Sequence, residues 1–366
     1  MLAYRLLNAQ TQPEFQEILE PHAGPGQVVV KVAGSGLCHT DFTVVSRERS
    51  YWKDDPPPFT LGHEIAGWVE ELGTGVKGFQ RGDAVAVNPS WASCGRCHMC
   101  RSGEENHCLY QKAIRAPGVG YDGGHAPYVL VPEARFLVLI GNLNPVEAAP
   151  LTDAGLTTYA AIKPALPGIY PGSTAVVIGI GGLGLYAIQF LRQLTGARIV
   201  AVDSSEARLK LAREYGADDI VTSGAGAAGQ IRELSRGIGA AFVLDCVGVN
   251  ETLATGVAAL SWKSRLAMVG AGGGSIPFDF FKVPPWRPAG DELERRQRCV
   301  EGGPRHGRSG SDQDPRGPLS SQRCETGVRR FQARTSRRSR GGDSRWIGST
   351  RGVIVRARVL LTQKGT

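Results

Sequence analysis

The segment from residue 173 to residue 203 most restricts the fold, because it alternates strand, glycine turn, helix and strand. "STAVVIGI" is a buried apolar strand, "LGLYAIQFLRQLTG" is a helix ending at Gly196, and "RIVAVD" is a second strand. The runs "EARLKLAREYGA", "AFVLDCVG" and "RLAMVGAGG" continue the alternation as a helix and two strands. This order predicts a parallel sheet with crossover helices, so residues 151–283 are expected to form an α/β domain.

Four glycines form a G-x-G-G-x-G pattern between the first strand and the first helix: Gly179, Gly181, Gly182 and Gly184. They permit a tight turn and the close approach of a pyrophosphate to the helix N-terminus. Asp203 ends the next strand 19 residues after Gly184, where its carboxylate would accept hydrogen bonds from ribose hydroxyls and repel a 2′-phosphate. The pattern predicts NAD rather than NADP, with Arg208 flanking the adenosine, and a glycine turn without a ligand is the alternative.

A cysteine cluster lies in the stretch from about residue 91 to residue 110. Its spacing is C-x₂-C-x₂-C-x₇-C, formed by Cys94, Cys97, Cys100 and Cys108. Four thiolates at this spacing wrap tetrahedrally around one zinc ion and leave no position for substrate, so the role is structural. A ferredoxin-type iron–sulfur cluster remains the alternative.

The first 150 residues have a different pattern of short β-rich runs separated by Gly, Pro and Asp. "QVVVKVA", "EIAGWVEEL", "DAVAVN" and "APYVLV" are predicted to be strands of an all-β unit. The fold class is therefore α/β plus all-β, with a domain boundary near residue 150.

Three further residues combine the side-chain types that suit zinc. Cys38 stands in "GSGLCHTDF", His63 in "LGHE" and Asp153 in "APLTDAGLTTYAAI". A nicotinamide cofactor implies hydride transfer, which needs a group to polarise the C–O bond, and a zinc with three protein ligands keeps a fourth position open. Taken singly, each residue also has a purely structural explanation. Cys38 could be a small buried apolar residue, His63 a core histidine and Asp153 a helix cap.

The motifs together resemble those of the zinc-dependent medium-chain alcohol dehydrogenases, of the NAD-dependent actinobacterial type. They are "GLCHTD", "LGHEIAGWVEELGTGVKGFQRGDAVAV", "CGRCHMCRSGEENHC", "PLTDAGLTTY" and "VVIGIGGLGLYAIQFLR", and the likeness spans about residues 1–283. The resemblance implies a GroES-like catalytic domain, a Rossmann domain and reversible oxidation of a primary or secondary alcohol to an aldehyde or ketone. It also implies two zinc ions per chain, NAD and a homodimer or homotetramer.

The resemblance assigns a role to each matching residue. Cys38, His63 and Asp153 would bind the catalytic zinc, with Asp153 standing where the family has a second thiolate. Glu64 would be a nearby carboxylate that approaches the metal transiently, and Thr40 would take the alcohol proton. His39 would lie near the cofactor pyrophosphate. A histidine often follows the proton-accepting hydroxyl by three positions, but this sequence has Thr43 there.

Residues 284–366 depart from the family pattern. They carry 19 Lys and Arg against 8 Asp and Glu, whereas residues 1–283 have a balance of −3. This Arg-, Gly- and Ser-rich tail is expected to be poorly ordered, apart from a strand-like run from Gly352 to Leu361, and a shifted reading frame is one hypothesis for its origin. Two other functions remain open: a zinc-binding protein without catalysis, and a carrier for a tail that binds polyanions such as RNA.

The N-terminus "MLAYRLLNAQTQPEF" lacks the apolar core of a signal peptide, and no run reaches the roughly 18 apolar residues of a membrane span. The eight cysteines suggest metal binding or catalysis rather than disulfides. A cytoplasmic location without a membrane partner is therefore expected, and the chemistry favours a small molecule over nucleic acid.

Overall fold

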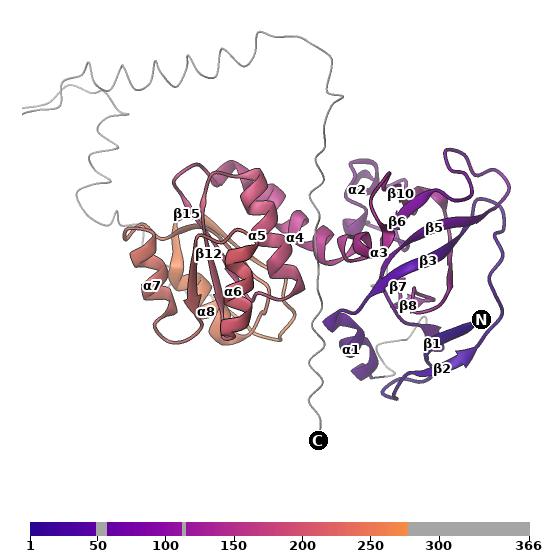
Figure 1. The fold of residues 1–366 in the computed structure, drawn as a ribbon, viewed down its shortest axis with the longest axis horizontal. Coiled ribbons are helices and arrows are strands. Elements are labelled where there is room, and N and C mark those ends of the chain that lie inside the picture. The colour runs from indigo at the N-terminus through magenta and orange to yellow at the C-terminus, as the bar shows by residue number, and fades with distance from the viewer. Residues whose placement is uncertain (49–56, 112–114, 277–366) are drawn as a thin grey trace, which may run out of the picture. The chain divides into compact units, whose positions relative to one another are not determined.

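The computed structural model describes residues 1–48, 57–111 and 115–276. They form a β-rich part followed by a part in which strands and helices alternate (Figure 1). The predicted fold class, all-β followed by α/β, is confirmed. The predictions for residues 277–366, including the strand from Gly352 to Leu361, lie outside the described residues.

The β-rich part is built on a five-stranded antiparallel sheet in the order β10-β6-β5-β3-β9. Its strands are β3 (Val28–Gly36), β5 (Glu64–Leu72), β6 (Ala84–Val87), β9 (Tyr128–Val131) and β10 (Leu137–Leu139). A second sheet, in the order β2-β1-β4, contains β1 (Leu2–Leu6), β2 (Glu14–Glu17) and β4 (Phe59–Thr60), and a short pair joins β7 (Ala116–Pro117) to β8 (Gly120–Tyr121).

The alternation of side chains along the strands places one face of the large sheet in the core. Val30 of β3 lies opposite Val69 of β5, and both are buried, whereas the neighbouring Trp68 is 38% exposed. Phe136, at the end of the 3₁₀ turn η3 (Ala134–Phe136), is 1% exposed and joins this core. The β-branched residues that pack well on a pleated surface thus fix which face of β3 and β5 is buried.

Short helices connect the β-rich part to the alternating part. These are α3 (Pro145–Ala148), η4 (Ala149–Thr152), α4 (Ala154–Ile162) and η5 (Lys163–Gly168). Asn144 caps α3 by accepting a 3.0 Å hydrogen bond from the Val146 N–H, and Pro145 takes the first helical position. Tyr159 of α4 contacts Phe190 edge to face, with ring centroids 5.6 Å apart.

The alternating part is a five-stranded parallel sheet in the order β13-β12-β11-β14-β15. Its strands are β11 (Thr174–Ile178), β12 (Arg198–Asp203), β13 (Asp219–Thr222), β14 (Ala240–Asp245) and β15 (Leu260–Met268). The crossover helices are α5 (Gly182–Leu194), α6 (Glu206–Glu214), α7 (Ala227–Leu234) and α8 (Asn250–Ala259). Strand order reverses beside β11, the strand that leads into the glycine turn, and ligands of such sheets bind outside the carboxyl ends of the strands at a point of this kind.

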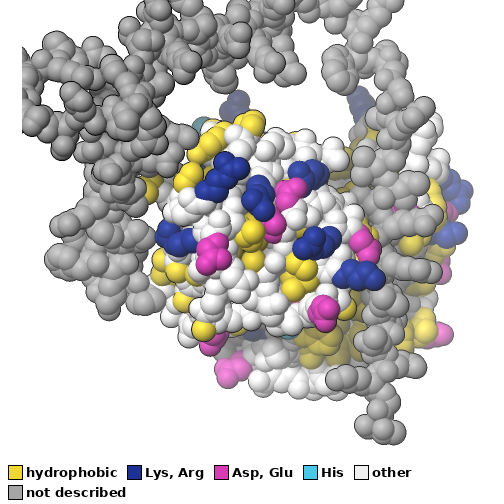
Figure 2. Space-filling model, turned by 60° about the vertical axis from the view of Figure 1, so that its left-hand side comes forward, with side chains coloured by type: hydrophobic (Ala, Val, Ile, Leu, Met, Phe, Trp, Pro, Cys, Tyr) yellow, Lys and Arg dark blue, Asp and Glu magenta, His cyan; other side chains and the backbone are white. Residues whose placement is uncertain are grey.

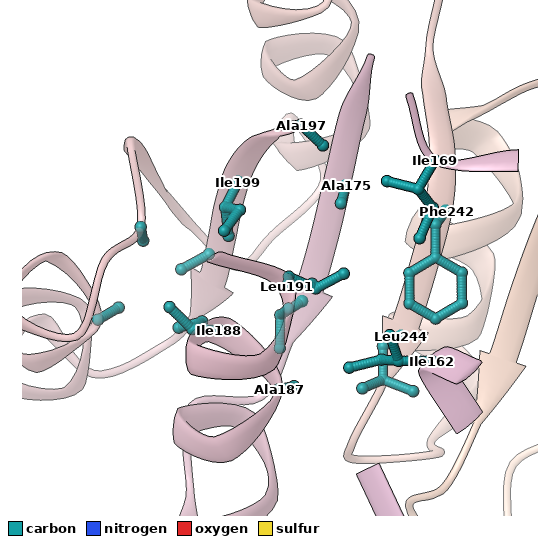
Figure 3. Close-up of a cluster of buried hydrophobic side chains, with 14 of the residues drawn as sticks. Ile162, Ile169, Ala175, Ala187, Ile188, Leu191, Ala197, Ile199, Phe242 and Leu244 are labelled. Carbon is teal, nitrogen blue, oxygen red and sulfur yellow. The ribbon is translucent and has the colours of Figure 1, made fainter. Parts of the chain in front are cut away.

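The packing of α5 against the sheet explains why this part of the chain is so regular. Ile188 and Leu191 are fully buried and point toward Ile199 and Phe242 of the sheet (Figure 3). Residues spaced three and four apart on a helix share one face, so α5 presents an apolar stripe to the strands. Truncating Leu191 to alanine would cost about 2–5 kcal/mol.

The observed boundaries agree with the expected ones in most places. The structure has β5 and β12 at the predicted residues, but α5 ends at Leu194 instead of Gly196, and β15 begins at Leu260, five residues before the predicted run. A helix, α1 (His39–Ser46), interrupts the region expected to be all-β. Among the described residues, no helix has both the length and the hydropathy needed to cross a bilayer.

Candidate active site and cysteine lobe

The glycine turn between β11 and α5 has the close backbone packing expected for it. Gly179 has φ +87°, a conformation that favours glycine, and its N–H donates to the Val202 carbonyl at 2.8 Å. A Cβ on Gly184 would overlap the Gly179 carbonyl oxygen, whereas one on Gly182 would meet nothing within 4 Å. Gly181 immediately precedes the first residue of α5. The turn thus brings the helix N-terminus to the carboxyl end of the strand.

Asp203 fastens this turn to the next strand. It is 5% exposed, and its Oδ2 accepts a 2.7 Å hydrogen bond from the Ile180 N–H. Its Oδ1 accepts from the Ser205 N–H at 2.8 Å. Arg208 Nη1 lies 3.8 Å from Asp203 Oδ2, and the Arg208 side chain is 58% exposed. A fixed carboxylate with one neighbouring guanidinium therefore lies beside the glycine turn.

The start of α1 positions Cys38. Cys38 precedes the helix, and its N–H donates to Asp41 Oδ2 at 2.9 Å, so the acidic residue of the first turn satisfies a free donor. Cys38 Sγ lies 3.3 Å from Asp153 Oδ2 and 3.6 Å from Thr40 Oγ1. Asp153 is the residue before α4, so the two side chains come from segments 115 residues apart.

His63 completes this cluster from the end of the loop before β5. It is 5% exposed, with Nε2 3.5 Å from Asp153 Oδ2 and Nδ1 3.1 Å from Asp41 Oδ1. Neither ring nitrogen has a well-directed hydrogen bond. The potential ligand atoms of Cys38, His63 and Asp153 lie within 4.8 Å of one another. A soft sulfur, a buried imidazole nitrogen without a directed partner and a carboxylate oxygen fit a zinc ion with an open fourth position.

The charges around His63 favour a cation at this place. Burial lowers the pKa of His63, but contacts with Asp153, Asp41 and Cys38 outweigh burial and raise it to about 12. Burial also raises the pKa of Asp153, yet the His63 imidazolium more than offsets this and lowers it. Without metal, the cluster thus holds a proton on His63, and a bound metal cation would compete with that proton.

Glu64 lies next to the cluster and is 5% exposed. Burial and the nearby Asp153 carboxylate raise its pKa to about 7, against the opposing effects of His63 and the Ala154 N–H. A Cβ on Gly36 would overlap Glu64 Oε2, so glycine is needed where β3 passes this carboxyl group. A carboxyl group that titrates near neutrality therefore lies beside the three candidate ligands.

The four cysteines of the lobe also come together. Cys97 Sγ lies 3.4 Å from Cys100 Sγ and 4.0 Å from Cys108 Sγ, and Cys94 Sγ is 3.9 Å from Cys100 Sγ. Tetrahedral Zn–S bonds place sulfurs about 3.8 Å apart. The short helix α2 (His98–Arg101) and the 3₁₀ turn η2 (Glu105–His107) carry the loop around them. The spacing fits a single ion rather than a multi-iron cluster.

Backbone N–H groups favour the thiolate forms of Cys97 and Cys108, whereas burial and the neighbouring Cys97 raise the pKa of Cys100 to about 12. The N–H groups of Cys100 and Leu109 lower the pKa of Cys97, and those of Cys94 and Tyr110 lower the pKa of Cys108. Thiolates are the metal-binding form of cysteine, so the lobe is prepared for a cation.

The structure brings some predicted residues together and leaves others apart. His39 is an exposed first residue of α1, and its ring is 6.1 Å from that of Phe42. Thr40 is exposed beside Cys38. Sequence reasoning missed Asp41 as a partner of His63. Its place three residues after Cys38, where an acid can cap a helix, was the available signal.

Two family models match the chain. The alcohol dehydrogenase GroES-like domain matches residues 24–141, and the zinc-binding dehydrogenase domain matches residues 182–287. An NAD-dependent alcohol dehydrogenase of Sulfurisphaera tokodaii is 39% identical over 287 residues, which are 76% of this chain and 80% of that relative.

Solved structures agree with the sequence matches. The alcohol dehydrogenase of the hyperthermophilic archaeon Aeropyrum pernix superposes with TM-score 0.70 and 35% identity, over 77% of this chain and 82% of that one. A cobalt- and zinc-bound thermostable alcohol dehydrogenase from Pyrobaculum aerophilum superposes with TM-score 0.66 and 30% identity, over 77% and 80%. The β-rich part is thus GroES-like and the alternating part is a Rossmann domain. The chain belongs to the zinc-dependent medium-chain alcohol dehydrogenases.

Proposed function

We propose that this protein catalyses reversible hydride transfer between a primary or secondary alcohol and NAD. The observation that carries the proposal is the cluster of Cys38, His63 and Asp153, whose potential ligand atoms lie within 4.8 Å of one another. Three ligands leave one position of a tetrahedral ion for substrate. Relatives with this activity support the same reaction class.

The proposed roles at the metal follow from the contacts of each side chain. Cys38, His63 and Asp153 would hold zinc, which when bound supplies a Lewis acid that lowers the pKa of an oxygen ligand. Thr40 has its hydroxyl 3.6 Å from Cys38 Sγ, so it can accept the alcohol proton and pass it toward solvent. Glu64 would be the nearby carboxylate that approaches the metal transiently, and without zinc its pKa is raised to about 7.

The proposed cofactor site uses the glycine turn and the end of β12. Gly179, Gly181, Gly182 and Gly184 would admit the pyrophosphate to the start of α5, and His39 would lie near it. The Asp203 carboxylate would accept hydrogen bonds from the ribose hydroxyls, with Arg208 flanking the adenosine. NAD supplies the hydride acceptor, and the negative charge of Asp203 disfavours the extra phosphate of NADP.

The remaining parts of the proposal concern organisation. Residues 1–150 would form the catalytic domain, and residues 151–283 would form the NAD-binding domain. The cysteine lobe of the catalytic domain would bind zinc through Cys94, Cys97, Cys100 and Cys108. Residues 284–366 would be a divergent tail. The protein would be a homodimer or homotetramer in the cytoplasm, where reducing conditions keep the ligand thiols free. On the face shown in Figure 2, basic and acidic side chains are interspersed, an arrangement unlike the basic stripe of a nucleic-acid footprint.

Metal analysis and NADH formation on a panel of primary and secondary alcohols test the proposal together. Two zinc ions per chain with turnover are expected, and Cys38→Ser should lose one zinc and all turnover. One zinc with no turnover on any alcohol would favour a zinc-binding protein without catalysis. A salt-sensitive RNA shift that disappears on truncation at Pro284, without alcohol turnover, would favour the polyanion carrier.

A further inference from the structure

Arg135 connects the cysteine lobe to the core of the β-rich domain. It lies in η3, distant in sequence from the lobe, yet its Nη2 donates to the Ser93 carbonyl at 2.6 Å and its Nη1 to Ser93 Oγ at 3.1 Å. Ser93 directly precedes Cys94, the first cysteine of the lobe, and is 6% exposed. The guanidinium therefore grips the backbone at the point where the lobe begins.

The other edge and one face of this guanidinium are also occupied. Glu133 accepts from Arg135 Nε at 2.9 Å and from Nη2 at 3.1 Å. Arg135 Cζ lies 4.0 Å from the centre of the Phe136 ring, within the range of a cation–π contact. A Cβ built on Gly95 would lie 3.3 Å from the same Cζ. The planar group is thus held between the domain core and the backbone of the lobe, which a lysine could not reproduce.

The charge of Arg135 also suits this position. A zinc ion with four thiolates carries a net charge of −2, which a neighbouring cation stabilises. Its hydrogen bond with Glu133 raises the pKa of Arg135 further, so the guanidinium stays charged. Two further basic residues, Arg96 and Arg101, are exposed members of the lobe itself.

We propose that Arg135 is a positioning residue for the zinc of the cysteine lobe: it clamps Ser93 to the domain core and slows release of the metal. Mutation of residues that support metal ligands typically weakens metal affinity by about 10- to 100-fold. The proposal depends on zinc in the lobe and is independent of alcohol turnover.

Zinc release to a chromogenic chelator tests the proposal. The measurement uses the full chain carrying Cys38→Ser, so that the lobe supplies the released zinc. Arg135→Leu should speed release by at least about tenfold. Arg135→Lys, which keeps the charge and loses the fork, should speed it several-fold. Arg81→Leu is the matched control, because Arg81 pairs with Glu70 on the same domain and its side chain is 74% exposed.

Thermal unfolding separates a clamp on the lobe from a general role in stability. Arg135→Leu should lower the unfolding temperature of the zinc-loaded protein, and the difference from the parent should vanish once the lobe zinc is removed. Release rates within twofold of the Arg81→Leu control, or an unfolding difference that persists without zinc, would overturn the proposal. If Arg135→Leu does not fold, the Arg135→Lys release rate decides by the same twofold limit.

Discussion

Asp41 Oδ1 lies 3.1 Å from His63 Nδ1, in a contact between two side chains that are 8% and 7% exposed. The same carboxylate accepts the Cys38 N–H through its other oxygen, so one buried acid contacts two of the three candidate zinc ligands. A carboxylate behind a metal-binding histidine sets the tautomer and the orientation of the ring. The other ring nitrogen of His63, Nε2, lies 3.5 Å from Asp153 Oδ2.

The first prediction concerns Asp41. Asp41→Asn should weaken binding of the catalytic zinc by about 10- to 100-fold while leaving the lobe zinc in place. Competition with a chelator followed by metal counting measures this. Asp83→Asn is the matched control, because Asp83 also accepts a backbone N–H from the residue three positions earlier, Gln80, at 2.8 Å. Equal zinc affinity in the two variants would remove Asp41 from the proposed site.

The second prediction separates two glycines of the turn. Gly184→Ala should lower the free energy of unfolding by about 1–3 kcal/mol, because the new Cβ overlaps the Gly179 carbonyl oxygen. Gly182→Ala should leave stability unchanged, since its Cβ meets nothing within 4 Å, but should weaken NAD binding where the pyrophosphate approaches. Urea unfolding measures the change in stability, and NAD titration measures the change in cofactor affinity. Unchanged NAD affinity in Gly182→Ala would argue against a pyrophosphate at this turn.

The third prediction is a pH dependence of stability due to Glu64. In the folded protein without catalytic zinc, burial raises the pKa of Glu64 from 4.5 to about 7. Between these pH values the folded state binds more protons than the unfolded state, so stability falls as pH rises. The loss is roughly 3 kcal/mol at most.

Urea unfolding at pH values on either side of this range, after removal of the catalytic zinc with a chelator, measures the effect. Glu64→Gln should abolish the Glu64-dependent part of the decline. Glu71→Gln is the control, because Glu71 lies on the same strand with a side chain that is 42% exposed. This variant should retain the full decline in stability. An identical pH profile for Glu64→Gln and the parent would be the contrary result.

The fourth prediction concerns cofactor choice. Asp203→Asn removes the negative charge beside the glycine turn, so the ratio of kcat/KM with NADP to that with NAD should rise at least about tenfold, or about 1.4 kcal/mol. Both Asp203 oxygens accept backbone N–H groups, so the substitution can also lower stability. The ratio of the two kcat/KM values does not depend on the fraction of enzyme that is folded, so it reports cofactor choice alone. Asp219→Asn, on the neighbouring strand β13 and paired with Arg198, should leave the ratio unchanged.

Local sequence patterns were sufficient for the regular elements. β12 was predicted at its observed bounds because all its residues after Arg198 are buried, and such a continuous apolar run between a helix and a turn has few other interpretations. The start of β15 was missed because Ser261, Trp262 and Lys263 are polar or partly exposed, and no period of two marks them. α1 was missed because its eight residues carry only two buried side chains, Asp41 and Val44.

The candidate site was predictable only as far as residue types and spacing reach. Cys38, His63 and Asp153 were chosen by their chemistry, and the structure brings them together. The contact between Asp41 and His63 and the grip of Arg135 on Ser93 join residues far apart in the chain. Such contacts depend on how strands and loops pack, which no local periodicity encodes. The metal and cofactor roles of the individual residues stay predictions.

The separation of Cys38 and Asp153 along the chain would give the proposed catalytic ion a second effect. A cation held by both would close a loop between positions 115 residues apart, with Asp153 at the start of the helix that contacts α5. Closing a long loop removes conformational freedom from the unfolded chain, much as a crosslink does. The ion proposed for catalysis would then also stabilise the folded state. Removing it with a chelator would lower both the activity and the resistance of the protein to unfolding.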